Sequence, residues 1–275
     1  MLPAEHVPPW RSLFAAGGFR WGLNLRRGDA AAFFAPSDRS GALLAEKRQL
    51  LDLRPDLYLA TAPISAPLIT ELRQLVADWS RVPSAAQTGD LPADLTAMAL
   101  HWEPDVLLMD RATLSLAAGC VCFPSSWDLR RAIGKTVDRV HDLVPQLNSQ
   151  IGPQITRFLA ELRPGKAFLR ENWSLTRTAD RNYHPELGRQ RLEPDVPLTE
   201  VWLRVERQLF TGLPTGGLMG LRIEVCPLLD VANDRSAWIG LRETLRTMPL
   251  EVACYKSLAD AQAVLVRQMA EVVRS

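Results

Sequence analysis

The chain has few side chains suited to holding a metal or cofactor through imidazole, because its only histidines are His6, His101, His141 and His184. His141 lies in the segment VDRVHDLVP, where helical spacing puts it on one face with Val137 and Val140. By spacing alone, this pattern is more typical of a core histidine held by hydrogen bonds than of a ligand. His184 stands in a long loop, so we expect it to be solvated.

Two segments that alternate between apolar and polar residues supply the other candidate groups. One face of the alternation in residues 201–210 carries Trp202, Arg204, Glu206 and Gln208, and one face of that in residues 167–175 carries Arg170, Asn172 and Ser174. Such a set is usually the solvated face of an antiparallel sheet, although Trp202 argues mildly against that interpretation. If the two strands share a face, a carboxylate would lie opposite guanidinium groups in a patch suited to binding a small cation or moving protons.

The cysteines are too few and too scattered for a disulfide framework, so we expect reduced thiols at Cys120, Cys122, Cys226 and Cys254. Cys120 and Cys122 are one residue apart, closer than zinc ligands commonly are, and are typical of small buried strand residues. The pair Cys226-Pro227 is a possible thiolate ligand for haem, but a cysteine that ends a strand more often serves packing.

Several catalytic signatures are missing from the sequence. It contains no Walker phosphate loop, no G-x-G-x-x-G after a predicted strand, no H-E-x-x-H, no G-x-S-x-G and no C-x-x-C-H. These motifs mark nucleotide binding, zinc proteases, serine hydrolases and covalently attached haem. Any electrons used in redox chemistry would therefore come from another protein.

Composition indicates an ordinary globular protein. The chain has 275 residues, of which 47% are hydrophobic and 23% charged, and a net charge of +1 favours neither nucleic acid nor an anionic membrane as a partner. It has no apolar run long enough to span a bilayer, and its start lacks the pattern of a signal peptide. We expect a soluble cytoplasmic protein with an N-terminal arm, residues 1–18, and one domain, residues 19–275.

The elements that must position these residues follow from periodicity and from Gly and Pro. Helices are predicted over residues 41–53, 65–79, 136–143, 151–162, 236–247 and 257–274, and strands over 105–109, 114–123, 167–175, 201–210 and 218–226. Ser125 and Asp128 resemble a capping box that opens a further helix, and residues 84–94 are predicted to be a loop. The segment 176–200 is longer than most loops and is predicted to be a lid or a variable insertion. Together these elements predict an α+β fold, an antiparallel sheet with flanking helices.

A run of motifs resembles one family. GCVCFPSSWDLRRAIGKTVDRVH, then VP, a helix that bears phenylalanine, LRENW and LRVERQLFTGLP resemble the haem-dependent oxidative N-demethylase alpha-subunit family in order and spacing. FRWGLNL and AEKRQLLD are similar to its N-terminal part, and the likeness covers about residues 19–274. One departure is local: the family often has a proline two residues after the histidine, whereas here Asp142 and Leu143 precede Val144 and Pro145, which affects the loop's shape.

The resemblance implies a PAS-like sheet that holds haem b without covalent links, with His141 as axial ligand to the iron and Cys226 as its rival. It implies that Arg170, Asn172 and Trp202 lie near the haem and that Arg204 and Glu206 take part in catalysis. The reaction implied is removal of a methyl group from a small secondary amine, using dioxygen and electrons from reductase subunits that carry flavin and an iron–sulfur centre, with release of formaldehyde. The alternatives are a haem-binding PAS-like sensor or gas-binding module without turnover, and a haem-free binding protein.

Overall fold

The computed structural model describes residues 8, 10–14, 17–37, 41–80 and 91–272. These residues form a seven-stranded antiparallel sheet flanked by helices, so the predicted α+β fold is confirmed. In spatial order the strands are β1 (Arg26–Arg27), β5 (Ala167–Thr176), β6 (Trp202–Gly212), β7 (Gly216–Pro227), β3 (Asp105–Asp110), β4 (Leu116–Cys120) and β2 (Leu59–Thr61).

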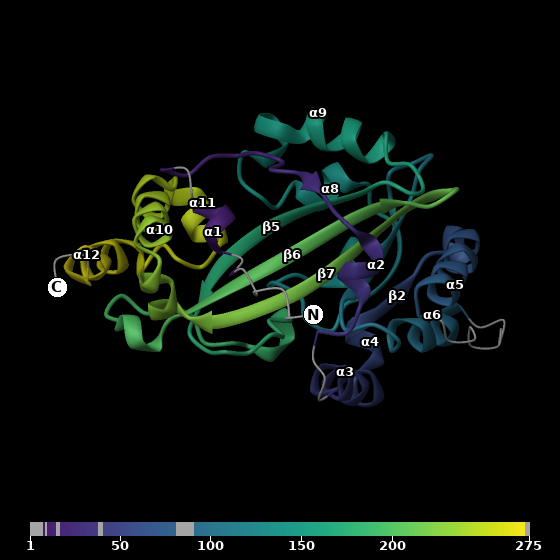
Figure 1. Ribbon diagram of the computed structural model, residues 1–275, viewed down its shortest axis with the longest axis horizontal. Coiled ribbons are helices and arrows are strands. Elements are labelled where there is room, and N and C mark those ends of the chain that lie inside the picture. The colour runs from purple at the N-terminus through teal and green to yellow at the C-terminus, as the bar shows by residue number, and fades with distance from the viewer. Residues whose placement is uncertain (1–7, 9, 15–16, 38–40, 81–90, 273–275) are drawn as a thin grey trace, which may run out of the picture.

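The helices surround this sheet at both ends and along one edge (Figure 1). The α-helices are α1 (Trp10–Leu13), α2 (Ala30–Phe34), α3 (Ala42–Leu53), α4 (Pro55–Tyr58), α5 (Ala66–Ser80), α6 (Leu91–Ala99), α7 (Leu129–Ala132), α8 (Val137–His141), α9 (Leu147–Ala160), α10 (Arg235–Thr247), α11 (Leu250–Tyr255) and α12 (Gln262–Val272). Four 3₁₀ helices complete the set: η1 (Pro63–Ser65), η2 (Pro185–Leu187), η3 (Leu198–Glu200) and η4 (Leu228–Asn233). None of these described helices is long and apolar enough to cross a membrane.

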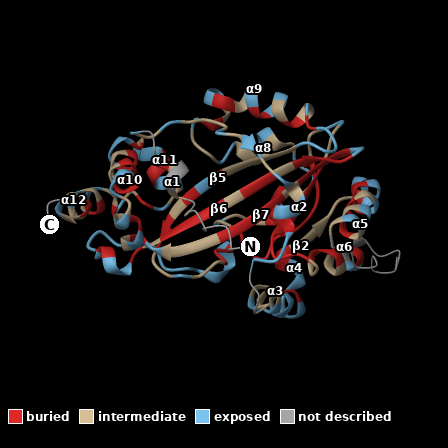
Figure 2. Cartoon of the chain, viewed as in Figure 1, coloured by how far each residue is buried: buried red, intermediate tan, exposed pale blue. Residues whose placement is uncertain are grey.

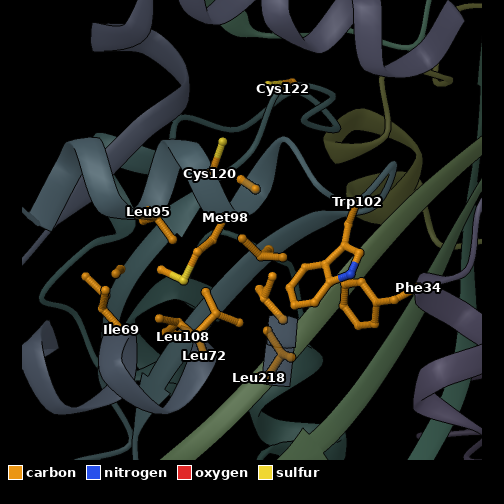
Figure 3. Close-up of a cluster of buried hydrophobic side chains, with 14 of the residues drawn as sticks. Phe34, Ile69, Leu72, Leu95, Met98, Trp102, Leu108, Cys120, Cys122 and Leu218 are labelled. Carbon is orange, nitrogen blue, oxygen red and sulfur yellow. The ribbon is translucent and has the colours of Figure 1, made fainter. Parts of the chain in front are cut away.

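One face of the long strands is covered by two apolar clusters. The first packs α2, α5 and α6 against the sheet around Leu108, Leu209 and Leu218, and Figure 3 shows its tightly grouped side chains. The second packs α10 and α12 against Leu203 and Val205 near the opposite end of β6. These clusters explain why alternate residues of β5, β6 and β7 are apolar, and why the central strands are largely buried in Figure 2.

The other face is covered differently, by α8 and α9. Phe168 of β5 and Phe210 of β6 pack there with Phe158 of α9 at ring-centroid distances of 5.4 and 5.6 Å. Many apolar side chains of this layer are only partly buried, unlike those of the first face. The layer therefore covers the polar face of β5 and β6 less completely.

A tight hairpin fixes the register of β6 and β7. Gly212 pairs with Gly217, and the ladder continues without a shift to the pair of Trp202 and Pro227. A β carbon on Gly216 would lie 2.1 Å from the carbonyl oxygen of Met109, so only glycine lets β7 approach β3 this closely.

Three local predictions are wrong. Helix α7 begins after Asp128, whose carboxylate accepts a hydrogen bond from the Arg130 backbone at 2.9 Å, so Ser125 is not its cap. Residues 257–274 are not one helix, because a turn precedes α12, and α11 was not predicted. Within the predicted loop 84–94, α6 has already begun at residue 91, and residues 84–90 lie outside the described part of the chain.

Part of the predicted N-terminal arm packs on the body of the protein. Phe14, which follows α1, is fully buried and meets the ring of Trp173 edge to face at 5.2 Å. The chain then crosses to α10, where the Phe19 backbone donates a hydrogen bond to Thr247 at 2.7 Å. Trp21 and Leu23 continue onto the α9 layer.

Candidate functional site

The register of β5 and β6 brings most of the predicted polar residues onto one face. Arg170 lies opposite Gln208, Asn172 opposite Glu206 and Ser174 opposite Arg204 in the ladder. Directly opposed residues of antiparallel strands point to the same side. The two strands are therefore neighbours, as the site prediction required.

This face is not the solvated side that the alternation alone suggested. Arg204, Glu206 and Gln208 are only 1%, 7% and 8% exposed. Trp202 lies four residues from Glu206, about 13 Å along the strand, so it is outside this cluster. The site opens to solvent at Asn172 and at Tyr255, which is 47% exposed.

Glu206 is the carboxylate at the centre of the cluster. The Ser125 hydroxyl donates a hydrogen bond to one of its oxygens, and the Gln208 side-chain amide donates to the other. Ser125 in turn accepts a hydrogen bond from Arg204. Both oxygens of Glu206 are therefore oriented by the chain itself, which is why Ser125 faces the sheet and does not cap α7.

Arg204 binds mainly to backbone. Its guanidinium donates to the carbonyls of Phe123, Pro124 and Arg181 at 2.8, 3.3 and 2.9 Å. Burial lowers the pKa of Arg204 to about 10, which leaves the group charged at neutral pH. Arg204 thus ties the segment after β4 and the long segment after β5 to the sheet, and it reaches Glu206 through Ser125.

Lys256, between α11 and α12, joins this cluster, and the sequence analysis missed it. Its Nζ donates to the carbonyl of Trp173 at 2.7 Å, lies 3.4 Å from Oδ1 of Asn172, and stands 5.3 Å from the Trp173 ring centroid. Burial lowers the pKa of Lys256 to about 8; Glu206 opposes this shift and Arg170 adds to it. No local pattern marks Lys256, because the turn after α11 brings it to the edge of β5.

His141 ends α8 on the side of the sheet that carries Arg170. Burial and the nearby Arg170 guanidinium lower the pKa of His141, so its imidazole is neutral at pH 7, the form that binds iron. A hydrogen bond between Gln146 and Glu251 links the α8–α9 turn to α11. This bond holds the turn after α8 next to the helix that precedes Lys256.

The residues present fit a haem group at this face. A porphyrin iron needs one protein donor and an apolar slot, and the His141 imidazole would be that donor. Nε of Arg170 is buried without a hydrogen-bond partner among the described residues, so this cation has capacity for an anionic group. The partly buried apolar side chains that line this region are Val137, Val140, Val144, Phe158, Phe168 and Phe210.

Cys226 does not fit as the iron donor. It pairs with Leu203, which places it on the opposite face of the sheet, where it packs with the α10 cluster. Burial raises the pKa of the Cys226 thiol to about 12, so the thiolate is disfavoured.

Neither His184 nor His101 makes a hydrogen bond or ion pair with this cluster among the described residues. His184 is 1% exposed, so the expectation that it is solvated is wrong. Its Nδ1 accepts a hydrogen bond from the backbone of Glu186 at 3.2 Å, and its Nε2 lies 3.8 Å from a carboxylate oxygen of Asp128. His101 is partly exposed in the turn after α6, and His6 lies outside the described residues.

Comparison with known proteins identifies one family. Residues 81–266, about two thirds of the chain, match the family model described as "Haem-dependent oxidative N-demethylase, alpha subunit-like". The matched span contains His141, Arg170, Glu206 and Lys256. A search of curated proteins found no match.

Proposed function

The chain belongs to the haem-dependent oxidative N-demethylase alpha-subunit-like family, and from this premise we propose that it binds haem b non-covalently and removes a methyl group from a small secondary amine. We propose that the antiparallel sheet is PAS-like and that its face beneath α8 and α9 holds the haem. The observation that carries the proposal is the buried carboxylate of Glu206 on the sheet face that α9 and α8, which ends at His141, cover.

The proposed reaction balances as a monooxygenation. A secondary amine R–NH–CH₃ reacts with dioxygen, two electrons and two protons to give R–NH₂, formaldehyde and water. When bound, haem would be held by His141 and would supply the activation of dioxygen. The chain itself would supply binding, orientation and proton control.

Glu206 is proposed to bind the ammonium form of the amine and to accept its proton. A carboxylate fixed by hydrogen bonds from Ser125 and Gln208 keeps one orientation, which favours repeated binding in a single geometry. Arg204 is proposed to act on catalysis as a positioning residue, because its donors bind backbone carbonyls and Ser125. Asn172, at the open edge of β5, is proposed to contact haem or substrate.

Electrons are proposed to come from separate reductase subunits with flavin and iron–sulfur centres. The family description refers to an alpha subunit, which supports an assembly with partners. The sequence contains none of the nucleotide motifs searched for, which agrees with this division. We expect NADPH alone to reduce little of the haem iron in the isolated chain. Robust reduction without a partner would contradict the proposal that separate reductase subunits supply the electrons.

The test begins with visible spectra of protein purified from cells supplied with haem. Wild type and Cys226→Ser should show the same histidine-type spectrum, whereas His141→Ala should lose haem or change its axial spectrum. Formaldehyde release is then measured with methylated amines and a supplied electron donor. Glu206→Gln keeps the shape of the side chain and should sharply lower turnover while retaining haem.

Each outcome of this series distinguishes one alternative. Haem binding without formaldehyde from any amine would favour the sensor or gas-binding module. A protein without haem would favour the haem-free binding protein. A carbonyl complex with the red-shifted band of thiolate ligation, or unchanged haem in His141→Ala, would overturn the assignment of His141.

A further inference from the structure

Two cations of the candidate site, Lys256 and Arg170, form no ion pair among the described residues and have hydrogen-bond donors to spare. A lysine ammonium has three N–H donors. That of Lys256 contacts the Trp173 carbonyl at 2.7 Å and Oδ1 of Asn172 at 3.4 Å, which leaves one donor. Nε of Arg170 is likewise buried without a partner among the described residues.

The two cations lie on one patch. Arg170 and Asn172 are two residues apart on β5 and so share a face, about 7 Å along the strand. Lys256 is held at Asn172, and Asn172 lies opposite Glu206. The oxygens of Glu206 already accept from Ser125 and Gln208, so this carboxylate is not fully available to the two cations.

The charge of the patch is therefore unbalanced. Within the described residues, neither Lys256 nor Arg170 forms an ion pair at 4.0 Å or less, whereas Glu206 is linked through Ser125 to a third cation, Arg204. Partly buried cations without a counterion are costly, and a bound anion offsets that cost. Two neighbouring unused N–H donors are best matched by a carboxylate, which has two acceptor oxygens.

We propose that Lys256 and Arg170 form a carboxylate-binding pair next to Glu206. The carboxylate has two possible sources, a propionate of haem or an acid group on the amine substrate. In the second case the preferred substrate would be an N-methyl amino acid, with its ammonium on Glu206 and its carboxylate on Lys256 and Arg170. The inference rests on the proposed function in its choice of these two ligands.

The variants remove the Lys256 charge in two ways. Lys256→Met keeps the aliphatic stem, and Lys256→Gln keeps a donor for the Trp173 carbonyl, so one can replace the other if it does not fold. Lys256→Arg restores the charge. Lys166→Met, at an exposed lysine, is the matched control, and thermal unfolding of every variant verifies the fold.

One arm of the experiment tests the haem source. Protein freed of haem is titrated with haem b and with haem whose propionates are methyl esters. If a propionate is the ligand, wild type binds haem b about 10- to 100-fold more tightly than the ester, the range expected for a charge-assisted hydrogen bond. Lys256→Met and Lys256→Gln would lose this ratio, and Lys256→Arg would recover most of it.

The other arm tests the substrate source by calorimetry, on protein with and without haem. N-methylglycine is compared with N-methylethylamine, which keeps the N-methyl amine and lacks the carboxylate. If the substrate supplies the carboxylate, wild type prefers N-methylglycine by about tenfold or more, and the neutral variants lose that preference.

Loss, in Lys256→Met and Lys256→Gln, of the preference for haem b over its methyl ester supports the pair and identifies a propionate as its ligand. Loss of the preference for N-methylglycine over N-methylethylamine supports the pair and identifies the substrate carboxylate. If both ratios stay within twofold of wild type in Lys256→Met and Lys256→Gln, or fall equally in Lys166→Met, the proposal is overturned. Failure of the proposed function is a separate result, because it appears as absence of haem binding or of formaldehyde in wild type. Calorimetry on haem-free protein still tests the carboxylate-binding pair when wild type shows no haem binding or no formaldehyde release.

Discussion

Replacing Arg204 by methionine should destabilise the protein strongly, because this side chain links three parts of the chain. Arg204 is 1% exposed and donates to three backbone carbonyls and to Ser125. Methionine has a similar volume but leaves those acceptors without their donor. Removing one partner from a buried charged network costs about 3–5 kcal/mol of unfolding free energy.

Thermal unfolding followed by circular dichroism measures this effect. At about 2 °C per kcal/mol for a chain of this size, the midpoint of Arg204→Met should fall by roughly 6–10 °C. Arg157→Met is the matched control, because the Arg157 side chain is 80% exposed and pairs with Glu161 on the surface of α9 at 3.0 Å. That pair should contribute only about 0.3–0.5 kcal/mol, so the control should shift by about 1 °C or less.

A midpoint for Arg204→Met within about 2 °C of wild type would refute this reasoning. It would mean that water or rearranged side chains satisfy the carbonyls of Phe123, Pro124 and Arg181. Arg204 would then not be needed to hold these segments, and its proposed role in positioning Ser125 and Glu206 would lose its physical basis.

Three further predictions follow from burial. Gly240→Ala should lower the free energy of unfolding by about 1–3 kcal/mol, because the added β carbon would lie 1.7 Å from the carbonyl oxygen of Phe14. The displaced N-terminal segment should then be cut more readily in limited proteolysis, and unchanged cutting would contradict this. Burial lowers the pKa of His184, so below pH 6.5 the unfolded chain takes up a proton first and stability falls, by at most about 1.4 kcal/mol per pH unit. His184→Gln should show a shallower loss between pH 7 and 5 in urea unfolding, and equal slopes would exclude this cause. Iodoacetamide at pH 8 should modify exposed Cys254 well before Cys226, whose pKa burial raises to about 12; equal rates would be inconsistent with that burial.

The sheet could be predicted because its central strands have opposite requirements on their two faces. Leu203 and Val205 face the apolar cluster of α10 and α12, while Arg204 and Glu206 face the polar cluster, so the alternation in β6 is sharp. The same alternation in β5 put Arg170 and Asn172 on one side. Such alternation fixes which residues of each strand share a face, so the residues at the core of the site could be predicted once β5 and β6 were taken as neighbours.

The errors concern residues whose environment is set by distant parts of the chain. His184 was expected in solvent, but the segment after β5 folds back, and the Arg181 carbonyl is held by Arg204. Ser125 has the type and spacing of a helix cap, but Asp128 caps the helix and frees Ser125 to bind Glu206. Nothing near Lys256 in sequence indicates that α11 will carry it to β5.

The hydrogen bonds of buried cations distinguish groups that hold the fold from groups that await a ligand. Lys47 is fully buried, and its ammonium contacts four backbone carbonyls and lies 3.4 Å from Asp105. Arg222 binds the carbonyls of Phe33 and Ala35 as well as Ser37 and Glu103, and Arg204 binds carbonyls in the same way.

Arg170 and Lys256 differ from these three in how few acceptors they have. In the described part of the chain Arg170 makes no side-chain hydrogen bond, and the Lys256 ammonium contacts one backbone carbonyl and the Asn172 side chain. A folded protein tolerates such a deficit mainly where binding removes it. The deficit falls next to Glu206, which is why we place ligand binding there and not at the more deeply buried Lys47 and Arg222.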